Sequence, residues 1–359
     1  MIKTSYYQDL SKMNTFGMKV KARCFMEYDS VADLVDIEFE ELARPVLHIG
    51  GGSNLLFTDD FKGTVLHSKI NFIEILDECQ CITEAPSHSV MVSVGAGVVF
   101  DEFCDWAAKE GLWGVENLSH IPGEVGASAV QNIGAYGVEV KDVIRKVYCY
   151  DTLEEEFVHF DVEECEYGYR DSIFKNPEIK GRYIVTHVVF ALSRTADPHL
   201  EYGHLKEAVD CHFDRAERVE KSLTPALIRK VIIKIRKEKL PEPSAVCSAG
   251  SFFKNPVISP EHFARIEAAA KAEFGSDYKV PHYDLPDGMI KIPAAWMIEQ
   301  CGWKGRRSGG AAVWEKQPLV IVNYTGEAYP EEITGLEKRI MASVKAKFGV
   351  DLHPEVEHI

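Results

Sequence analysis

The sequence predicts an α+β fold organised in two or three domains. Its 359 residues are enough for each domain to bury a core of its own, and 46% of them are apolar, as is typical of globular proteins. Short apolar runs alternate with turns in the first half of the chain, whereas the last third carries two amphipathic helical patterns with strand-like runs between them. Strands and helices in separate blocks are typical of the α+β class.

Strands are expected in the first half where short apolar runs end at glycines or other turn residues. These runs cover residues 44–57 with a glycine turn inside, 90–94, 143–150 and 183–192. A short helix is expected at residues 101–110 and ends at Gly111. Its inward face carries Phe103, Trp106 and Ala107.

A longer helix is expected to begin at Thr224 and Pro225, which form an N-cap and first-turn pair. Apolar side chains recur on one face at helical spacing: Ile228, Val231, Ile232 and Ile235. The basic side chains of the same segment predict a solvated opposite face: Arg229, Lys230, Lys234, Arg236, Lys237 and Lys239. Pro241 and Pro243 then break the helix, so a domain boundary is expected near residue 240.

The last third predicts two more helices with a strand between them. One helix begins at Ser259 and ends at Gly275, and the other begins near Pro330 and ends before Gly349. The second helix has a periodic apolar face: Ile333, Leu336, Ile340, Val344 and Phe348. The strand is expected at residues 319–324.

The composition argues against several classes of protein. A formal net charge of −16 disfavours a general affinity for nucleic acid or anionic membranes, because both need a basic surface. No run reaches the roughly 18 apolar residues of a membrane helix, and no secretory signal is visible. The nine cysteines, Cys79 and Cys81 among them, follow no disulfide or metal-ligand spacing. A cytoplasmic protein with reduced thiols and no metal site is expected.

The most informative pattern is at residues 111–137. This stretch contains no Lys or Arg, although 27% of the chain is charged, and it is rich in glycine. So many glycines disfavour a helix or strand, since each costs about 0.5–1 kcal/mol relative to alanine inside an element. Bare backbone can approach a ligand closely, and successive N–H groups can hold a phosphate. The stretch therefore predicts a loop that binds a charged, aromatic-sized cofactor; a tightly packed structural loop is the alternative.

A second glycine turn, at residues 50–54, follows an expected buried strand. Its free N–H groups and the Ser53 hydroxyl are suited to a pyrophosphate. The turn does not match the GxGxxG pattern that opens a helix, which disfavours a Rossmann site. Taken alone, it fits a structural hairpin turn at least as well. Taken together, the two glycine-rich segments, both without Lys or Arg, predict one dinucleotide held between them.

Two further segments carry side chains suited to chemistry. Arg170 can clamp a carboxylate with two parallel hydrogen bonds, and a local pair with Asp171 is the alternative. Ser251 follows Gly250 and precedes two aromatic residues, without a GxSxG elbow. It is either a proton or hydrogen-bond donor at a cavity wall or an ordinary strand-entry serine. The tail, residues 353–359, is expected to be disordered because chain ends usually are.

Together these motifs resemble the UDP-N-acetylenolpyruvoylglucosamine reductase (MurB) family, flavoenzymes of bacterial peptidoglycan precursor synthesis. The resemblance runs nearly end to end and rests on NTFG, GGGSNLLF, NLSHIPGEVGASAVQNIGAYG, YGYRDSIFK, KLPEP, AGSFFKNP, GGAAV and PEV in one order. YGYRDSIFK and the run EYG at residues 201–203 resemble the type I form, which keeps a tyrosine-bearing substrate loop.

The resemblance implies a two-part FAD-binding module of the vanillyl-alcohol-oxidase type and a C-terminal α+β substrate-binding domain. The implied boundaries are residues 1–70 and 71–240 for the two parts of the module, 241–350 for the substrate domain and 351–359 for a tail that returns to the active site. It also implies non-covalent FAD, NADPH as the hydride donor and a monomeric protein.

The resemblance assigns roles to particular residues. The residues that match the family's FAD contacts are Gly50, Gly51, Gly52, Ser53, Asn54, Pro122, Gly123, Gly126, Ala127, Ser128, Gln131, Asn132, Gly134, Ala135, Tyr136 and Gly137. Those that match its substrate contacts are Tyr169, Tyr202, Lys239, Asn255 and Gln317. Three residues match catalytic positions: Arg170 stabilises an enolate, Ser251 protonates the alpha carbon, and Glu355 polarises the substrate carboxylate or positions the donor.

The implied reaction is the reduction of UDP-N-acetylglucosamine enolpyruvate to UDP-N-acetylmuramate. Two other functions stay open: an FAD-dependent oxidase or dehydrogenase of another small alcohol or sugar, and a nucleotide-binding module without catalysis. The residues also leave the choice between NADPH and NADH open, because no site for the 2′-phosphate can be identified.

Overall fold

The computed structural model describes residues 1–77, 89–215, 223–242 and 245–359. The chain divides into two compact units. The first contains Met1–Asp9, Lys21–Gly52 and Asp60–Lys237, and the second contains Leu10–Val20, Ser53–Asp59 and Glu238–Ile359. The predicted free thiols at Cys79 and Cys81 and the predicted break at Pro243 lie outside the described residues.

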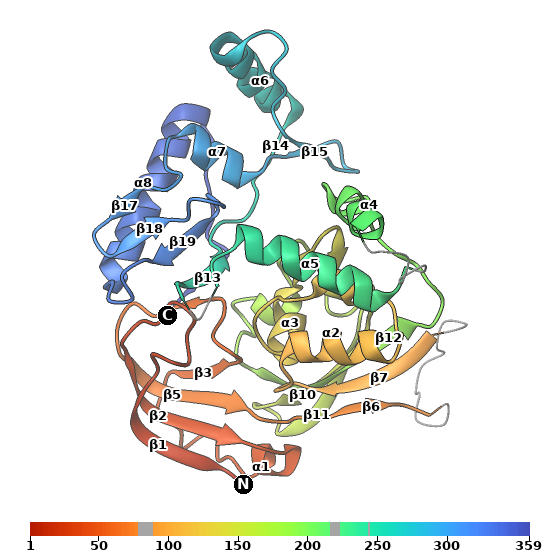
Figure 1. Cartoon of the computed structure of the whole chain (residues 1–359). Coiled ribbons are helices and arrows are strands. Elements are labelled where there is room, and N and C mark those ends of the chain that lie inside the picture. Colours follow the sequence, from red (N-terminus) through yellow and green to blue (C-terminus); the bar gives the residue numbers. More distant parts are fainter. Residues whose placement is uncertain (78–88, 216–222, 243–244) are drawn as a thin grey trace. The chain divides into compact units, whose positions relative to one another are not determined.

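A four-stranded sheet forms the N-terminal part of the first unit (Figure 1). Its strands run in the order β1 (Lys3–Asp9), β2 (Lys21–Tyr28), β5 (Phe61–Ser68) and β3 (Val46–Ile49). β1 is antiparallel to β2, whereas β2, β5 and β3 are parallel to one another. The short helix α1 (Val31–Val35) buries Leu34 in the same core. Strand β5 is buried from Gly63 to Ser68, as a central parallel strand should be.

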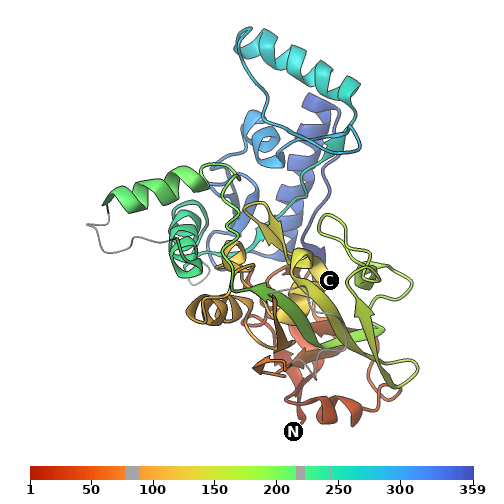
Figure 2. The ribbon, with the colours of Figure 1, turned by 90° about the vertical axis from the view of Figure 1, so that its right-hand side faces the viewer.

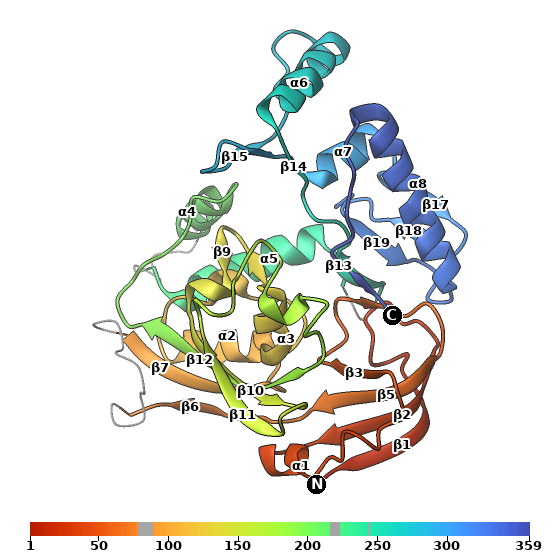
Figure 3. The same cartoon turned by 180° about the vertical axis from the view of Figure 1, so that it is seen from behind.

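A five-stranded antiparallel sheet makes up the second part of this unit. Its order is β11 (Glu156–Asp161), β10 (Ile144–Asp151), β12 (Tyr183–Ser193), β7 (Ser89–Gly95) and β6 (Ile73–Ile75). Helices α2 (Phe100–Lys109) and α3 (Val125–Gln131) share one apolar core with β7, β10 and β12 (Figures 1 and 3). At its centre the rings of Phe103 and Phe190 lie 4.7 Å apart.

Most expected elements of this unit are confirmed. The predicted helix at residues 101–110 is α2, with Phe103 and Ala107 fully buried and Trp106 half-buried. The predicted strands appear as β3, β7, β10 and β12. The second apolar run of residues 44–57 contains the short strand β4 (Leu55–Leu56), which belongs to the second unit.

The prediction that residues 111–137 form only a loop is wrong. This stretch contains the helix α3 and the strand β8 (Gly134–Ala135), which pairs with β9 (Val138–Glu139). Gly126 lies inside the helix, where a Cβ atom would come within 2.8 Å of Ala96 Cβ. Close packing of α3 against its neighbour therefore compensates for the low helix propensity of glycine.

Helix α5 (Pro225–Lys239) begins as predicted, and Thr224 Oγ1 accepts a hydrogen bond of 3.2 Å from Leu227 N. It follows α4 (Leu205–Arg215) and buries the apolar face that begins with Ile228.

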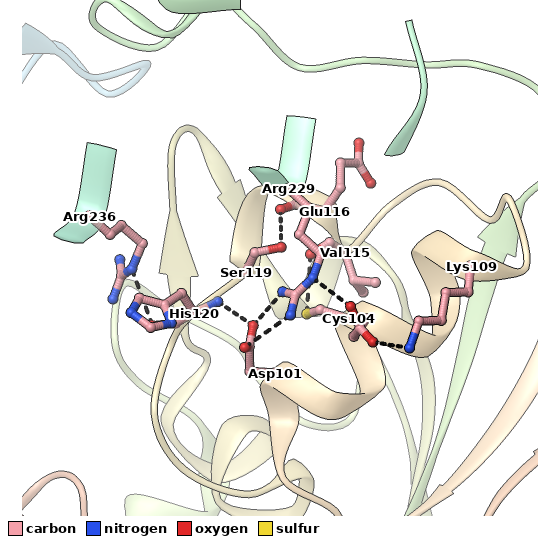
Figure 4. A network of polar contacts seen from close by, with 10 residues as sticks. Asp101, Cys104, Lys109, Val115, Glu116, Ser119, His120, Arg229 and Arg236 are labelled. Atoms are coloured by element: carbon pink, nitrogen blue, oxygen red, sulfur yellow. Dashed lines mark hydrogen bonds and ion pairs between the residues drawn. The ribbon is translucent and has the colours of Figure 1, made fainter. Parts of the chain in front are cut away.

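Two cations of α5 are not solvated, contrary to the prediction (Figure 4). Arg229 forms ion pairs with Asp101 and Asp105 of α2, and Arg236 Nε donates to His120 O at 3.2 Å. These contacts fasten α5 to α2 and to the segment that leads into the glycine-rich helix α3.

The second unit is built around a small antiparallel sheet with helices. The sheet order is β13 (Cys247–Ser251), β19 (Val320–Asn323), β18 (Ala311–Val313) and β17 (Arg307–Ser308). The other elements are β14 (Val257–Ile258), β16 (Ile290–Lys291), β15 (Tyr283–Asp284), α6 (Pro260–Phe274), α7 (Ala294–Gln300) and α8 (Pro330–Phe348). Helix α8 packs on β18 and β19. Figure 2 shows α6 near the C-terminal end of α8, where His262 Nε2 bonds Phe348 O at 2.8 Å.

The C-terminal tail is held in the second unit, so the prediction of a disordered tail is wrong. Strand β20 (Glu357–His358) pairs in parallel with β4. Thr58 N donates to Ile359 O at 2.8 Å, and His358 Nε2 lies 2.9 Å from Glu337 Oε2 on α8. The tail also buries Val356. Residues from three parts of this unit thus fix the segment that carries Glu355.

The α+β class is confirmed, and the finer boundaries at residues 70, 240 and 350 stay predictions. Within the described ranges, none of the helices is both long and apolar enough to cross a bilayer. Over the same residues, no group of three or more His, Cys, Asp and Glu side chains is arranged to hold a metal ion.

Candidate active site

The two predicted glycine segments meet within the first unit. A Cβ atom on Gly50 would lie 3.1 Å from Ala127 Cβ, and one on Gly51 would lie 3.6 Å from Gly123 Cα. Gly52 has a φ of +62°, in the left-handed region that favours glycine. The backbone after β3 therefore lies close to the backbone at the N-terminal end of α3.

Some glycines of the second segment make room for protein atoms. A Cβ atom on Gly134 would lie 2.8 Å from Arg170 Nη1 and 2.9 Å from Val138 O. Gly137, with a φ of +82°, faces Tyr202, whose Cβ would be 3.4 Å from an added side chain. At these positions, as at Gly126, the absence of a side chain permits close packing within the protein.

The polar side chains around α3 are mostly paired, with one exception. Ser128 Oγ donates to Val125 O at 2.7 Å. Asn132 ends the helix in the left-handed region and donates from Nδ2 to Gly168 O at 2.7 Å. Gln131 Oε1 accepts from Lys175 Nζ at 3.1 Å, whereas the buried Nε2 has no hydrogen-bond partner among the described residues. A buried unpaired donor is costly, so Gln131 is suited to a ligand acceptor.

Tyr136 is the next-to-last residue of the second glycine segment, which also contains Pro122, Gly123 and Ala135. It has a φ of +49°, and its carbonyl accepts a hydrogen bond of 3.0 Å from Asn117 Nδ2. Its ring meets the ring of Tyr202 edge to face at 6.3 Å. Burial raises the pKa of the Tyr136 hydroxyl, and the nearby Arg236 partly offsets this shift.

Arg170 is tied to the second glycine segment. Its guanidinium donates from Nη1 to Asn132 O at 3.2 Å and from Nη2 to Gly134 O. Its own φ is +55°, which non-glycine residues rarely adopt and which often marks a functional position. Lys175 Nζ donates to the Arg170 carbonyl at 3.0 Å. The Tyr169 ring, a predicted substrate contact, lies 5.4 Å from Arg170 Cζ.

Ser251 and Glu355 belong to neighbouring segments of the second unit. Ser251 ends β13 and is exposed, after Gly250 with a φ of +71°. The next residue, Phe252, accepts a hydrogen bond of 2.8 Å from Glu355 N. Asn54 from the first glycine turn donates to Glu355 O at 3.1 Å. Two of the three predicted catalytic residues and one predicted FAD contact therefore converge in this unit.

The remaining predicted substrate contacts of this unit are fixed by their backbones or amides. Asn255 Oδ1 accepts from Ala294 N at 2.9 Å. The backbone carbonyl of Lys239 accepts a hydrogen bond of 3.1 Å from Trp314 Nε1. The side chain of Lys239 takes no part in this bond and is exposed. Gln317 O accepts from Val320 N at 3.0 Å at the start of β19.

A buried polar cluster beside the glycine segments was not predicted from the sequence. His67 on β5 lies 3.1 Å from Glu27 and 2.9 Å from Glu124. Glu124 immediately follows Gly123 and is itself buried. The signal available in the sequence was an acidic residue next to a glycine in a stretch that lacks Lys and Arg, where no local cation can pair with it.

Comparison with known proteins defines the class of this protein. A family model described as an FAD binding domain matches residues 23–159. A model described as the C-terminal domain of UDP-N-acetylenolpyruvoylglucosamine reductase matches residues 242–359. The protein is an FAD-dependent oxidoreductase.

Relatives with the same organisation are similar over nearly the whole chain. The UDP-N-acetylenolpyruvoylglucosamine reductase of Bacteroides fragilis is 48% identical over 96% of this chain and 97% of the relative. That of Porphyromonas gingivalis is 42% identical over 98% of this chain and 97% of the relative. The chain belongs to the UDP-N-acetylenolpyruvoylglucosamine reductase family. Its fold also matches the crystal structure of that reductase from Thermus caldophilus, with a TM-score of 0.63 at 22% identity over 100% of this chain and 98% of that one.

The residues present fit FAD. Gln131 Nε2, which is buried and has no partner among the described residues, can donate to the cofactor. The turn at Gly50, Gly51 and Gly52 carries no side chains, and backbone N–H groups of such a turn are suited to a pyrophosphate. The individual contacts of FAD remain predictions that rest on this geometry and on the motifs.

Proposed function

We propose that this protein reduces UDP-N-acetylglucosamine enolpyruvate to UDP-N-acetylmuramate, with NADPH as the hydride source. The observation that carries the proposal is the 48% identity to a reductase of this name over 96% of the chain, together with the chemistry of Arg170, Ser251 and Glu355. When bound, FAD supplies a hydride carrier that accepts from NADPH and donates to the methylene carbon of the enolpyruvyl group.

Arg170 stabilises the negative charge that develops on the substrate carboxylate as the enolate forms. Its guanidinium is already oriented by the carbonyls of Asn132 and Gly134. A fixed cation needs little reorganisation at the moment of reaction, and one well-placed donor contributes about 3–4 kcal/mol in other enzymes. The left-handed backbone of Arg170 is strain that the surrounding contacts maintain.

Ser251 delivers the proton to the alpha carbon. It stands at the exposed end of β13, where its hydroxyl can exchange protons with solvent. A positioned proton donor typically accelerates a reaction by about 10²–10⁴-fold. Glu355, whose backbone N–H is bonded to Phe252 O, acts as a protonated acid that polarises the carboxylate or positions the donor. An ionised carboxylate at that point would repel the enolate.

Substrate recognition is assigned to five side chains. Tyr169, Tyr202, Lys239, Asn255 and Gln317 contact the sugar nucleotide, and Lys239 neutralises its diphosphate. A positive charge at this position attracts the diphosphate of the substrate, although the chain as a whole has a net charge of −16. The reaction takes place in the cytoplasm, on a monomer, as a step of peptidoglycan precursor synthesis.

An anaerobic half-reaction tests this function. NADPH is added to the purified yellow protein until the flavin absorbance is bleached, and UDP-N-acetylglucosamine enolpyruvate is then added. The proposal expects the oxidised flavin spectrum to return with the sugar nucleotide. If it stays bleached, while a simple sugar or alcohol bleaches the oxidised enzyme and consumes oxygen in a separate aerobic assay, the alternative oxidase is correct.

A further inference from the structure

His67 makes two carboxylate contacts from near the end of the buried strand β5. Its side chain is 2% exposed, with Nδ1 3.1 Å from Glu27 Oε1 and Nε2 2.9 Å from Glu124 Oε1. Each ring nitrogen is within hydrogen-bonding distance of a different carboxyl group, so the imidazole bridges the side chains of Glu27 and Glu124.

Glu124 occupies the junction of the two glycine segments. It is the N-cap residue of α3, between Gly123 and Gly126, and its side chain is only 8% exposed. While Oε1 faces His67, Oε2 lies 3.2 Å from the position that a Cβ atom on Gly50 would take. The carboxyl group of Glu124 therefore fills the space that the missing side chain of Gly50 leaves open. Glu124 belongs to the second glycine segment and contacts the first.

The groups around His67 come from every element packed against β5. Strand β2 contributes Glu27, which is paired with His67 in register, and Tyr28. Strand β3 contributes His48, whose Nε2 lies 2.7 Å from the Tyr28 hydroxyl. Burial, and to a smaller extent the charge of His67, lower the pKa of His48 to about 4. Neutral His48 therefore supplies no positive charge beside these two carboxyl groups.

We propose that His67 is a positioning residue of the FAD site: by bridging Glu27 and Glu124, it holds the two glycine segments in the arrangement that binds FAD. Without this imidazole, two largely buried carboxyl groups would lose a hydrogen-bond partner, which is costly. The proposal rests on FAD binding and is independent of the proposed sugar-nucleotide substrate.

The arrangement makes FAD affinity depend on the His67 side chain. Without its imidazole, Glu124 loses the contact with Nε2 that fixes its carboxyl group beside Gly50. The backbones of Gly50 and Gly123 are then no longer held together, and FAD affinity is expected to fall.

The test measures FAD binding to apoprotein by flavin fluorescence at neutral pH. His67→Gln, whose side chain cannot contact both carboxyl groups as the imidazole does, is expected to weaken FAD binding by about 10- to 100-fold. His187→Gln is the matched control, because it replaces another histidine of a central strand, β12. Its FAD affinity should equal that of the wild type.

Two further measurements keep the proposal testable if His67→Gln folds poorly. Glu27→Gln changes the partner on β2 and should also weaken FAD binding. Hydrogen exchange of the apoprotein should be faster at residues 50–52 and 123–127 in Glu124→Gln than in the wild type. Wild-type FAD affinity in both His67→Gln and Glu27→Gln, or unchanged hydrogen exchange at these residues in Glu124→Gln, would overturn the proposal.

Discussion

The backbone N–H of Glu355 donates a hydrogen bond of 2.8 Å to the carbonyl of Phe252. Phe252 directly follows Ser251, so this bond ties the C-terminal segment to the end of β13. An isolated bridge between Phe253 and Pro354 and a bond from Lys254 N to His353 O extend the contact. Two residues that are about one hundred positions apart in the chain are thereby held on neighbouring backbone segments.

Replacing Ser251 with alanine should separate the two halves of the reaction. Flavin reduction by NADPH should be nearly unchanged, whereas reoxidation by UDP-N-acetylglucosamine enolpyruvate should slow by about 10²–10⁴-fold, because the proton donor is lost. Stopped-flow absorbance follows both steps. Ser248→Ala on the same strand is the control and should reoxidise normally. Equal reoxidation rates in Ser251→Ala and the wild type would exclude the proton-donor role.

Arg170→Lys keeps a positive charge but loses the two-donor geometry. A lysine ammonium cannot reproduce the fork that bonds the carbonyls of Asn132 and Gly134. Reoxidation by the sugar nucleotide is expected to slow by about 10²–10³-fold. Arg182→Lys, which alters an ion pair with Asp151, is the comparison and should leave this rate unchanged. The assignment fails if the two variants behave alike.

Alanine should be tolerated at Gly51 but not at Gly126. An added Cβ atom at Gly51 meets its nearest neighbour at 3.6 Å, an ordinary contact, whereas at Gly126 it meets Ala96 Cβ at 2.8 Å. Overpacking of this kind costs about 1–3 kcal/mol. Urea unfolding of the two variants should show a loss of stability for Gly126→Ala and little for Gly51→Ala. The reverse order would contradict the packing described for α3.

The tail carrying Glu355 should loosen as the pH rises. The hydrogen bond from His358 to Glu337 raises the pKa of His358, although burial opposes the shift. Because the pKa of His358 is higher in the folded than in the unfolded protein, its protonated form stabilises the fold. This stabilisation is complete below the unfolded-state pKa of about 6.5 and is lost as the pH rises through the folded-state pKa. Hydrogen exchange at Glu357 and Ile359 should therefore accelerate at alkaline pH beyond its intrinsic rate. His358→Gln should lack this step, and an identical pH dependence in both proteins would refute it.

The anchor between α2 and α5 should fail at acidic pH. Burial alone would raise the pKa of Asp101, but the hydrogen bonds from Arg229 and from His120 N outweigh it and the net pKa is lowered. This pair stabilises the fold fully above the unfolded-state pKa of Asp101, which is about 3.9. The stabilisation is lost as the pH falls through the folded-state pKa. Asp101→Asn should cost about 2 kcal/mol at neutral pH, measured by urea unfolding. Lys109→Ala, at an exposed ion pair with Asp105, should have little effect.

The sequence predicts the elements whose signals are local. The helices α2, α5, α6 and α8 follow from apolar periodicity and from capping residues such as Ser259, whose hydroxyl accepts from His262 N. The glycine turns can be predicted because a cluster of glycines indicates backbone that must lie close to another group. Family motifs add the predicted catalytic residues, which composition and spacing alone leave undecided.

Other features depend on contacts between distant residues and are not visible locally. The helix α3 forms in a glycine-rich stretch because packing against Ala96 favours it. The helical pattern around Arg229 predicts a solvated face, but α2 places two aspartates beside it. The tail is held because β4, which lies about three hundred residues earlier, offers a strand edge. The role of His67 emerges only when β2 and the entrance to α3 bring carboxylates to both ring nitrogens.

The most direct test of the central claim is the stoichiometry of a single anaerobic turnover. Wild-type protein is mixed with equimolar NADPH and UDP-N-acetylglucosamine enolpyruvate, and the sugar nucleotide is analysed by mass spectrometry while NADPH oxidation is followed by absorbance. The proposed reaction predicts one sugar nucleotide heavier by two hydrogen atoms for each NADPH oxidised. An unchanged sugar nucleotide in the presence of NADPH and FAD-loaded protein would contradict it.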